Sequence, residues 1–294
     1  MSNFEDLRSY TLEEKEKLII SRYKSKLNFI GKQHPILKKI DSLNKNTKPN
    51  PERLAVIEGI WGLNLLVDNY IRVKHLIICI EDIYTIEAQV LIDKLVNMAE
   101  EVFVVSKRVF STFSEKDNSH GLMAVCYLPY KHFEDITLKK NNIVIVLDGL
   151  EIPGNVGTIL RSADATAIDA VIINNRKTRI NHPKTIRSSL GACFTVPIID
   201  SNYEETIEWL KKNKFGIVLT DTRAESQYFD LKYENRVAIV MGSEKYGIDE
   251  TWYKTDYTGI SIPMLGTCDS LNVGVAATII MYEVALKNKG VMKR

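Results

Sequence analysis

The chain has 294 residues, of which 45% are hydrophobic and 26% charged, and its formal net charge is +2. This length suits two domains with cores of their own, and so small a net charge does not by itself indicate a nucleic-acid-binding protein. The N-terminus is polar and charged, and the longest apolar stretches are too short to span a bilayer. We therefore expect a cytoplasmic protein without a signal peptide and without membrane contact.

The four cysteines, Cys79, Cys126, Cys193 and Cys268, are widely spaced and form no Cys-x-x-Cys pair. This spacing indicates neither a disulfide framework nor a zinc site. Three of the four lie in or beside apolar runs. We expect reduced and mostly buried thiols.

The sequence of the first 128 residues indicates two structurally different segments. Residues 1–50 are predicted to form a basic, helical extension, with one charged helix up to about residue 30 and a second from Pro35 to Leu43. Residues 51–128 are predicted to form a small α/β domain, because strand and helix patterns alternate there. Its strands are expected at 54–57, 75–80, 102–105 and 122–127, and its helices at 59–70 and 86–98.

After a predicted linker at residues 129–142, residues 143–294 indicate a second α/β domain. Strands are expected at 143–147, 170–174, 195–199, 215–219, 237–241 and 259–262, and helices at 156–167, 183–190, 204–213 and 271–287. The strands are continuous apolar runs rather than alternating ones. That pattern favours a parallel sheet with both faces covered.

In such sheets ligands bind beyond the carboxyl ends of the strands. The first unusual segment there is residues 148–161, in which a Pro-Gly turn precedes Asn155 at a predicted helix N-cap and Arg161 on the polar face of that helix. Asparagine is a preferred N-cap, and most charged helix residues are simply exposed. Neither residue therefore requires a function by itself.

The second segment is residues 242–247, Gly-Ser-Glu-Lys-Tyr-Gly. Its two glycines indicate a close approach of the backbone to another group, although an ordinary turn would also suit them. The pattern is neither Gly-x-Gly-x-x-Gly nor a phosphate-binding P-loop, so it indicates neither a dinucleotide nor an ATP site.

The third segment runs from Ile-Pro-Met at residues 262–264 through a polar loop to a helix rich in small residues. Ser270 or Asn272 could cap that helix. Small side chains at Gly274, Ala276 and Ala277 would allow it to pack closely against another backbone. A capped terminal helix is the plain alternative.

Together the three segments resemble the motifs of the TrmH (SpoU) family in the SPOUT superfamily of methyltransferases. The motifs are Asn-x-Gly-x-x-x-Arg at 155–161, Gly-Ser-Glu-x-x-Gly at 242–247, and Ile-Pro-Met at 262–264 with Ser-Leu-Asn-Val at 270–273. The resemblance covers roughly residues 143–288. Residues 56–59 and 119–125 also resemble the small, ribosomal-protein-like domain of ribosomal RNA members, nearest to the thiostrepton-resistance branch.

The resemblance implies a C-terminal parallel sheet with a trefoil knot, preceded by a small RNA-binding domain. It implies S-adenosylmethionine as the methyl donor, no metal, a ribose 2′-hydroxyl of ribosomal RNA (23S in particular) as the acceptor, and a homodimer whose interface includes helix 271–287. The alternatives are a transfer RNA 2′-O-methyltransferase of the same family and a non-catalytic RNA-binding protein that kept the fold. The missing Gly-x-Gly-x-x-Gly argues against a nucleotide-dependent oxidoreductase.

The resemblance also implies roles for single residues. Arg161 is expected to be essential, either as a base that a substrate phosphate assists or as a phosphate-binding group. Asn155 is expected to orient Arg161, and Glu244, Ser270 and Asn272 to fix the loop and the target ribose. The expected cofactor-binding residues are Thr220, Gly242, Ile262, Leu271 and Ala276.

Local charge indicates where RNA would bind. Eight lysines and arginines but one acid lie between Arg22 and Lys48, and five basic residues without an acid lie between Arg176 and Arg187. Such clusters suit phosphate binding, although a solvated face is the alternative for each. The expected RNA-binding residues are Arg22, Lys24, Lys26, Arg176, Lys177, Arg179 and Arg187.

Overall fold

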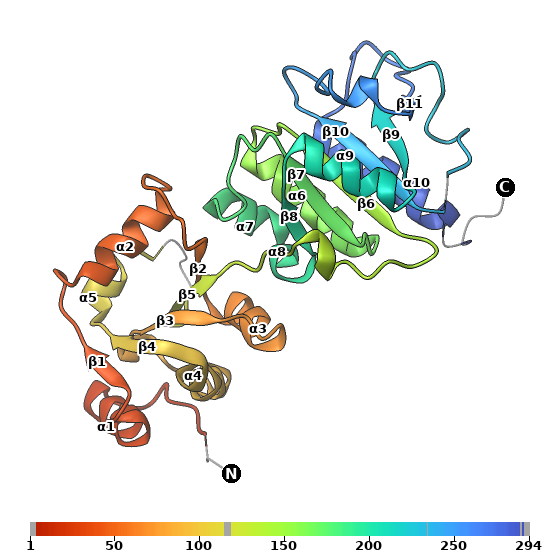
Figure 1. Ribbon diagram of the computed structural model, residues 1–294. Helices are drawn as coiled ribbons and strands as arrows, with labels where there is room; N and C mark the ends of the chain where they lie inside the picture. Colours follow the sequence, from red (N-terminus) through yellow and green to blue (C-terminus); the bar gives the residue numbers. More distant parts are fainter. Residues whose placement is uncertain (1–3, 115–118, 234, 289, 291–294) are drawn as a thin grey trace. The chain divides into compact units, whose positions relative to one another are not determined.

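The structure is a computed structural model that describes residues 4–114, 119–233, 235–288 and 290. The chain divides into two compact units, Met1–Leu128 and Pro129–Arg294 (Figure 1). The predicted basic extension belongs to the first unit, and the predicted linker belongs to the second. The finer division into four segments stays a prediction.

The first unit contains a five-stranded mixed sheet in the order β1-β4-β3-β5-β2. β1, β4 and β3 are parallel, and β5 is antiparallel to β3 and to β2. The strands are β1 (Leu27–Phe29), β2 (Leu54–Glu58), β3 (Val73–Ile78), β4 (Ala99–Val104) and β5 (Leu122–Tyr127). The helices are α1 (Leu12–Tyr23), α2 (Pro35–Asn44), α3 (Ile60–Asp68), η1 (Ile80–Asp82), α4 (Ile86–Met98) and α5 (Lys107–Phe110).

The predicted N-terminal helix over residues 1–30 is wrong in length. α1 begins only after Thr11, whose side chain accepts a hydrogen bond from the backbone of Glu14 in a capping box. The chain then turns into β1, in which Leu27 pairs with Val102 of β4. This strand depends on a partner 75 residues away in sequence (Leu27↔Val102), so local helical spacing could not predict it.

The second unit contains a six-stranded sheet in the order β11-β9-β10-β6-β7-β8, and all its strand pairs are parallel. The strands are β6 (Ile143–Asp148), β7 (Ala170–Asn174), β8 (Ile198–Asp200), β9 (Gly216–Thr220), β10 (Val237–Gly242) and β11 (Tyr257–Ile260). The helices are η2 (Phe133–Asp135), α6 (Pro153–Ala165), α7 (Pro183–Ser189), α8 (Ala192–Thr195), α9 (Tyr203–Lys212), η3 (Trp252–Lys254) and α10 (Val273–Asn288).

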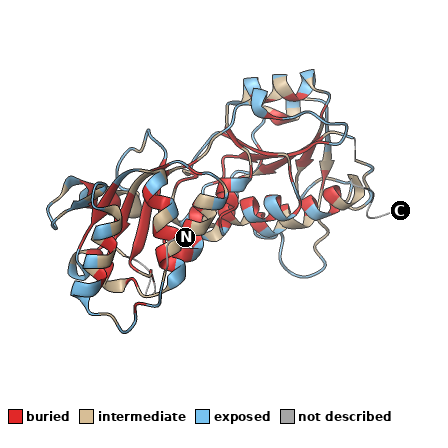
Figure 2. Cartoon of the chain, turned by 90° about the horizontal axis from the view of Figure 1, so that it is seen from below, coloured by how far each residue is buried: buried red, intermediate tan, exposed pale blue. Residues whose placement is uncertain are grey.

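The predicted parallel α/β sheet is therefore confirmed. Its interior strands β6 and β7 are buried at every residue, whereas the edge strand β11 is partly exposed (Figure 2). The strand predicted at 195–199 lies instead at Ile198–Asp200, because residues 192–195 form the short helix α8. The trefoil knot that the family resemblance implies stays a prediction. No helix in the described part of the chain is long and apolar enough to cross a bilayer.

Three of the four cysteines are buried, as expected, and Cys268 is exposed. Burial raises the pKa of the Cys193 thiol to about 11. A thiol with so high a pKa stays protonated and unreactive at neutral pH. Cys193 is therefore a packing residue.

Gly157 allows the two helices α6 and α7 to approach each other. A Cβ atom at this position would lie 1.9 Å from Ser188 Oγ and 2.5 Å from the carbonyl oxygen of Thr185. Backbone atoms cannot move away at low cost, so any side chain here would separate the helices. This contact fixes α6, the helix that carries the first motif.

We predict that Gly157→Ala lowers the free energy of unfolding of the second unit by about 1–3 kcal/mol, the usual cost of overpacking. Gly154→Ala is the matched control, since a Cβ at Gly154 meets nothing within 4 Å. It should be neutral or stabilise by up to about 1 kcal/mol. Both variants are made in protein that also carries Trp61→Phe, so that only Trp209 and Trp252 of the second unit fluoresce. The change in this fluorescence with urea concentration gives the unfolding midpoint of each variant. Equal midpoints for the two would contradict the steric account.

Candidate functional site

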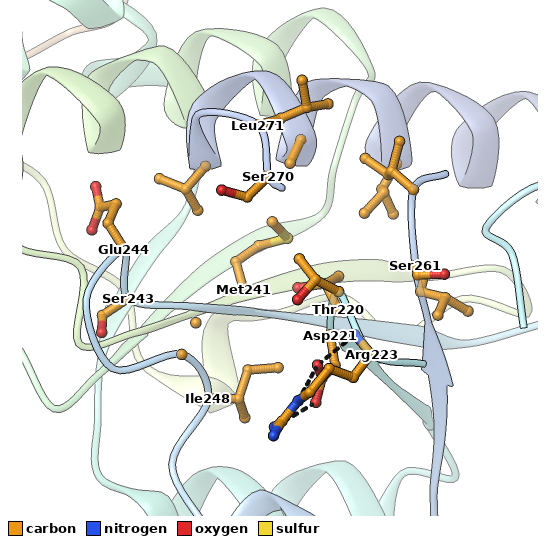
Figure 3. Close-up of a pocket in the computed structure, with 18 of the residues that line it drawn as sticks. Thr220, Asp221, Arg223, Met241, Ser243, Glu244, Ile248, Ser261, Ser270 and Leu271 are labelled. Atoms are coloured by element: carbon orange, nitrogen blue, oxygen red, sulfur yellow. Dashed lines mark hydrogen bonds and ion pairs between the residues drawn. The ribbon is translucent and has the colours of Figure 1, made fainter. Parts of the chain in front are cut away.

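A cavity of about 750 Å³ lies at the carboxyl ends of β9, β10 and β11, beside the start of α10 (Figure 3). This is the edge at which open parallel sheets bind ligands. Its walls come from the second and third motifs and from the segment that follows β9. The five residues predicted to hold a cofactor all line this cavity: Thr220, Gly242, Ile262, Leu271 and Ala276.

The three motif segments meet at the side chain of Asn155, which is only 9% exposed. Its amide nitrogen donates to Glu244 Oε1 of the second motif. Its amide oxygen accepts from Asn272 Nδ2 of the third motif at 3.0 Å. A single amide thus joins both segments, because it offers a donor and an acceptor at once.

The position of Asn155 differs from the predicted one. α6 begins at Pro153 with Ile152 as its N-cap, so Asn155 lies within the first helical turn. Proline suits that first position because the first helical N–H has no partner within the helix. The side chain is therefore free to cross to the other motifs. Asparagine at this place is a bridge and not a cap.

Asn272, one of the two residues expected to cap the C-terminal helix, does cap α10. Its Oδ1 accepts from the backbone N–H of Gly274 at 2.9 Å and of Val275 at 3.3 Å. The same side chain donates to Asn155, so helix α10 is placed by the bridge. Ser270 instead donates to Asp269 at 3.1 Å, and both residues line the cavity.

The glycines of the second motif are required by the loop itself. A Cβ atom on Gly242 would lie 2.3 Å from the carbonyl carbon of Gly247. Gly247 has a φ of 72°, which glycine adopts without strain. Ser243 and Gly247 exchange backbone hydrogen bonds of 2.9 and 3.0 Å across this turn. The tight turn presents Glu244 to Asn155.

Arg161 is exposed on α6 and is not among the residues that line the cavity. In the described part of the chain it makes no hydrogen bond and no ion pair, so Asn155 does not orient it directly. The two are six residues apart on one helix, and the helical repeat places them on different faces. A guanidinium that has no partner among the described residues remains available to another anion.

Asp148, at the end of β6, is a site-supporting residue that sequence reasoning missed. Its buried carboxylate accepts from Tyr203 Oη at 2.6 Å and from the backbone N–H of Asp249 at 2.8 Å. Burial raises the pKa of Asp148, and these two hydrogen bonds oppose the rise. The second bond fixes the chain just after the Glu244 turn. The only signal in the sequence is an acid that ends an apolar strand.

A second group of residues that the sequence did not predict as part of the site is centred on Asp221, just after β9. Asp221 accepts from Tyr253 Oη at 2.6 Å and from the Arg223 backbone N–H at 2.9 Å, and it pairs with the Arg223 guanidinium at 3.3 Å. Burial alone would raise the pKa of Asp221, but the hydrogen bonds from Tyr253 and Arg223 hold it below its usual value. All three residues line the cavity.

The basic residues predicted to bind RNA differ in whether they have interaction partners within the described chain. Lys24 and Lys177 are exposed, and no hydrogen bond or ion pair holds them within the described chain. Lys26 donates to Asn97 Oδ1 at 2.8 Å, and Arg176 forms an ion pair with Asp200. The remaining three, Arg22, Arg179 and Arg187, each have interactions within the chain. In the described residues no group of three His, Cys, Asp or Glu side chains is arranged to hold a metal ion.

Comparison with known proteins matches residues 142–282 to the model of the SpoU rRNA Methylase family. A relative in Staphylococcus epidermidis, assigned to the TrmH family of tRNA/rRNA methyltransferases, is 39% identical over 176 residues, which are 57% of this chain and 71% of that protein. The 23S rRNA (guanosine(2553)-2′-O)-methyltransferase RlmP of Bacillus subtilis is 28% identical over 63% of this chain and 72% of its own length.

A solved structure resembles nearly the whole chain. The AdoMet-bound rRNA methyltransferase of Sinorhizobium meliloti superimposes with a TM-score of 0.78 at 25% identity, over 91% of this chain and 99% of that one. The matched part includes most of the first unit as well as the sheet that bears the motifs.

We predict that Tyr203→Phe destabilises the protein most at neutral pH, by about 1–2 kcal/mol, because it removes a donor from the buried, ionised Asp148. The pKa of Asp148 is raised already and would rise further without this donor. As the pH falls through that pKa the carboxyl becomes neutral, and the deficit should shrink. Urea midpoints at pH 7 and at lower pH measure this, with the exposed Tyr257→Phe as control. A deficit that does not change with pH would contradict it.

Proposed function

Because the chain belongs to the SpoU (TrmH) family of RNA methyltransferases, we propose that it transfers a methyl group from S-adenosylmethionine to a ribose 2′-hydroxyl of ribosomal RNA. The observation that carries this proposal is the hydrogen-bonded junction of the three motifs at Asn155, beside the cavity. The junction ties the expected reaction site to the expected cofactor pocket.

The cavity suits the methyl donor in size and in chemistry. Its volume of about 750 Å³ lies within the range of small-molecule sites. Its walls combine apolar side chains such as Met241, Ile262 and Leu271 with backbone at the ends of three strands. The strand ends offer N–H and C=O groups to an adenine ring, and the apolar side chains pack on its faces. S-adenosylmethionine supplies a methyl group already activated on a sulfonium.

The chain itself has to bring a ribose hydroxyl to that methyl group. Arg161 is the residue we expect to be essential. An arginine stays protonated in proteins, so an exposed guanidinium binds a phosphate of the RNA readily. It acts as a base for the hydroxyl only if that phosphate assists it. Bound in either way, it holds the target nucleotide in place, and positioning supplies much of the barrier reduction.

The other motif residues hold the site in shape. Asn155 fixes the Glu244 turn and the N-terminus of α10 relative to each other. Glu244 and Ser270 then have defined places on the cavity wall, from which a carboxylate and a hydroxyl hydrogen bond to the target ribose. This arrangement argues against a non-catalytic protein, since binding RNA alone would not need three motifs joined beside a small-molecule cavity.

The first unit favours ribosomal RNA over transfer RNA. The rRNA methyltransferase of Sinorhizobium meliloti resembles this chain over 91% of its length, first unit included. RlmP is named for ribose methylation of 23S rRNA. We therefore propose 23S rRNA as the substrate. Transfer RNA remains the alternative, since the Staphylococcus relative is assigned to both classes.

A homodimer belongs to the same proposal. One side of α10 packs on α6, where Ser162 and Thr278 hydroxyls meet at 2.6 Å. Leu271, Val275 and Tyr282 are 38%, 47% and 44% exposed at and along this helix. Apolar side chains exposed in such a series are typical of a protein interface. A second copy on this face would cover them.

We predict that Arg161→Ala slows methyl transfer strongly while it leaves cofactor binding unchanged. Tritium transfer from methyl-labelled S-adenosylmethionine to total ribosomal RNA should fall about 100-fold or more, the scale on which electrostatic groups contribute to catalysis. Arg161→Lys should restore part of the rate, because it keeps a charge for the phosphate but loses the guanidinium fork. The matched control is Lys211→Ala on α9, which is exposed and outside the cavity.

Two results would contradict this account. If Arg161→Ala labels ribosomal RNA as fast as the control, the assignment of Arg161 is wrong. If the unaltered protein labels transfer RNA and leaves ribosomal RNA unlabelled, the substrate is wrong while the chemistry remains.

We also predict that binding to 23S rRNA weakens linearly as the logarithm of the salt concentration rises. Lys177→Gln should reduce the slope by about one, since it removes one phosphate contact, and Lys24→Gln should do likewise. Lys211→Gln is the control of equal charge and should leave the slope unchanged. A slope near zero for the unaltered protein would rule out the phosphate-binding role of both lysines.

A further inference from the structure

The charges on the cavity wall are unevenly distributed. Among the described residues that line it, four are acidic, namely Asp221, Glu244, Glu250 and Asp269, and one is basic, Arg223. S-adenosylmethionine at neutral pH carries two positive groups, the sulfonium and the α-ammonium, and one negative group, the α-carboxylate. A mainly acidic wall with one guanidinium therefore complements the charges of this ligand in sign, with acids for its two cations and a cation for its one carboxylate.

We propose that Arg223 binds the α-carboxylate of S-adenosylmethionine. The inference rests on the proposed function, and it deepens it by assigning one end of the cofactor to one residue. Arginine offers five N–H donors in a planar fork that matches a carboxylate, and no other lining residue in the described chain has a cationic side chain.

The guanidinium is held in place for this role. Its Nε and Nη2 atoms lie 3.3 and 3.4 Å from the two carboxylate oxygens of Asp221. These contacts are longer than a tight bidentate pair, and the side chain of Arg223 is 85% exposed. The remaining donors therefore stay accessible. Figure 3 shows Asp221 and Arg223 on the side of the cavity across from Ser270 and Leu271.

Tyr253 makes Asp221 a fixed support. The Tyr253 hydroxyl donates to Asp221 Oδ2 at 2.6 Å, and Tyr253 itself comes from η3, which follows the Glu244 turn. Asp221 is thus anchored from a second segment and holds Arg223 at the end of β9. Asp221 and Tyr253 are positioning residues for the guanidinium. The other acids leave the wall attractive to the ammonium and to the sulfonium.

The test compares two ligands that differ only in the carboxylate, S-adenosylmethionine and its decarboxylated form. Isothermal titration calorimetry gives the dissociation constant of each for the whole protein and for Arg223→Gln. We expect Arg223→Gln to weaken the binding of S-adenosylmethionine about threefold to fivefold, the effect of one charged hydrogen bond at a largely exposed side chain. The dissociation constant of the decarboxylated ligand should change less than about twofold.

A control variant completes the comparison. Lys211→Gln removes an equal charge away from the cavity and should leave both dissociation constants unchanged. Since the Arg223 side chain is largely exposed, its replacement leaves the core intact.

Three results would overturn the inference. Equal weakening of both ligands by Arg223→Gln would mean that Arg223 shapes the pocket without contacting the carboxylate. Unchanged binding of both, with a higher KM for RNA, would assign Arg223 to an RNA phosphate. In these two cases the proposed function stands. If the unaltered protein binds neither ligand, the inference and the proposed methyl donor both fail.

Discussion

The amide of Asn155 is the interaction on which the site depends. An asparagine side chain offers both a donor and an acceptor, and here each has a partner from a different motif, Glu244 and Asn272. An aspartate would place a second carboxylate beside Glu244, and an alanine would leave both partners without this bond. Because the bridge lies in a nearly buried position, its hydrogen bonds are worth more than at the surface.

The framework brings these groups within reach of each other. β6, which leads to Asn155, pairs directly with β10, which leads to Glu244. Gly157 lets α7 pack against α6, and Asp148 holds the chain beyond the Glu244 turn through Asp249. The parallel sheet, close helix packing and one buried carboxylate therefore all serve to fix the motif junction. The cavity and the junction then share Glu244 and Asn272, which come from two different loops.

The sequence predicted well what depends on local pattern and on motif identity. Continuous apolar runs indicated the parallel sheet, because strands buried on both faces need no alternation, and the motif resemblance indicated five residues that line one cavity. The sequence did not predict features that depend on contacts between residues far apart in the chain. β1 exists because Leu27 pairs with Val102, and Asn155 bridges instead of capping because its partners lie 89 and 117 residues away. No sequence motif indicates the Asp221–Arg223 pair, so it could not be predicted.

Alkaline digestion of the labelled RNA shows whether the methyl group reaches a ribose hydroxyl. Alkali cleaves RNA through the free 2′-hydroxyl, so a methylated ribose protects the bond beside it. Ribosomal RNA labelled by this protein with tritiated S-adenosylmethionine should release its label in alkali-resistant dinucleotides. Label recovered in mononucleotides would place the methyl group on a base and contradict the account.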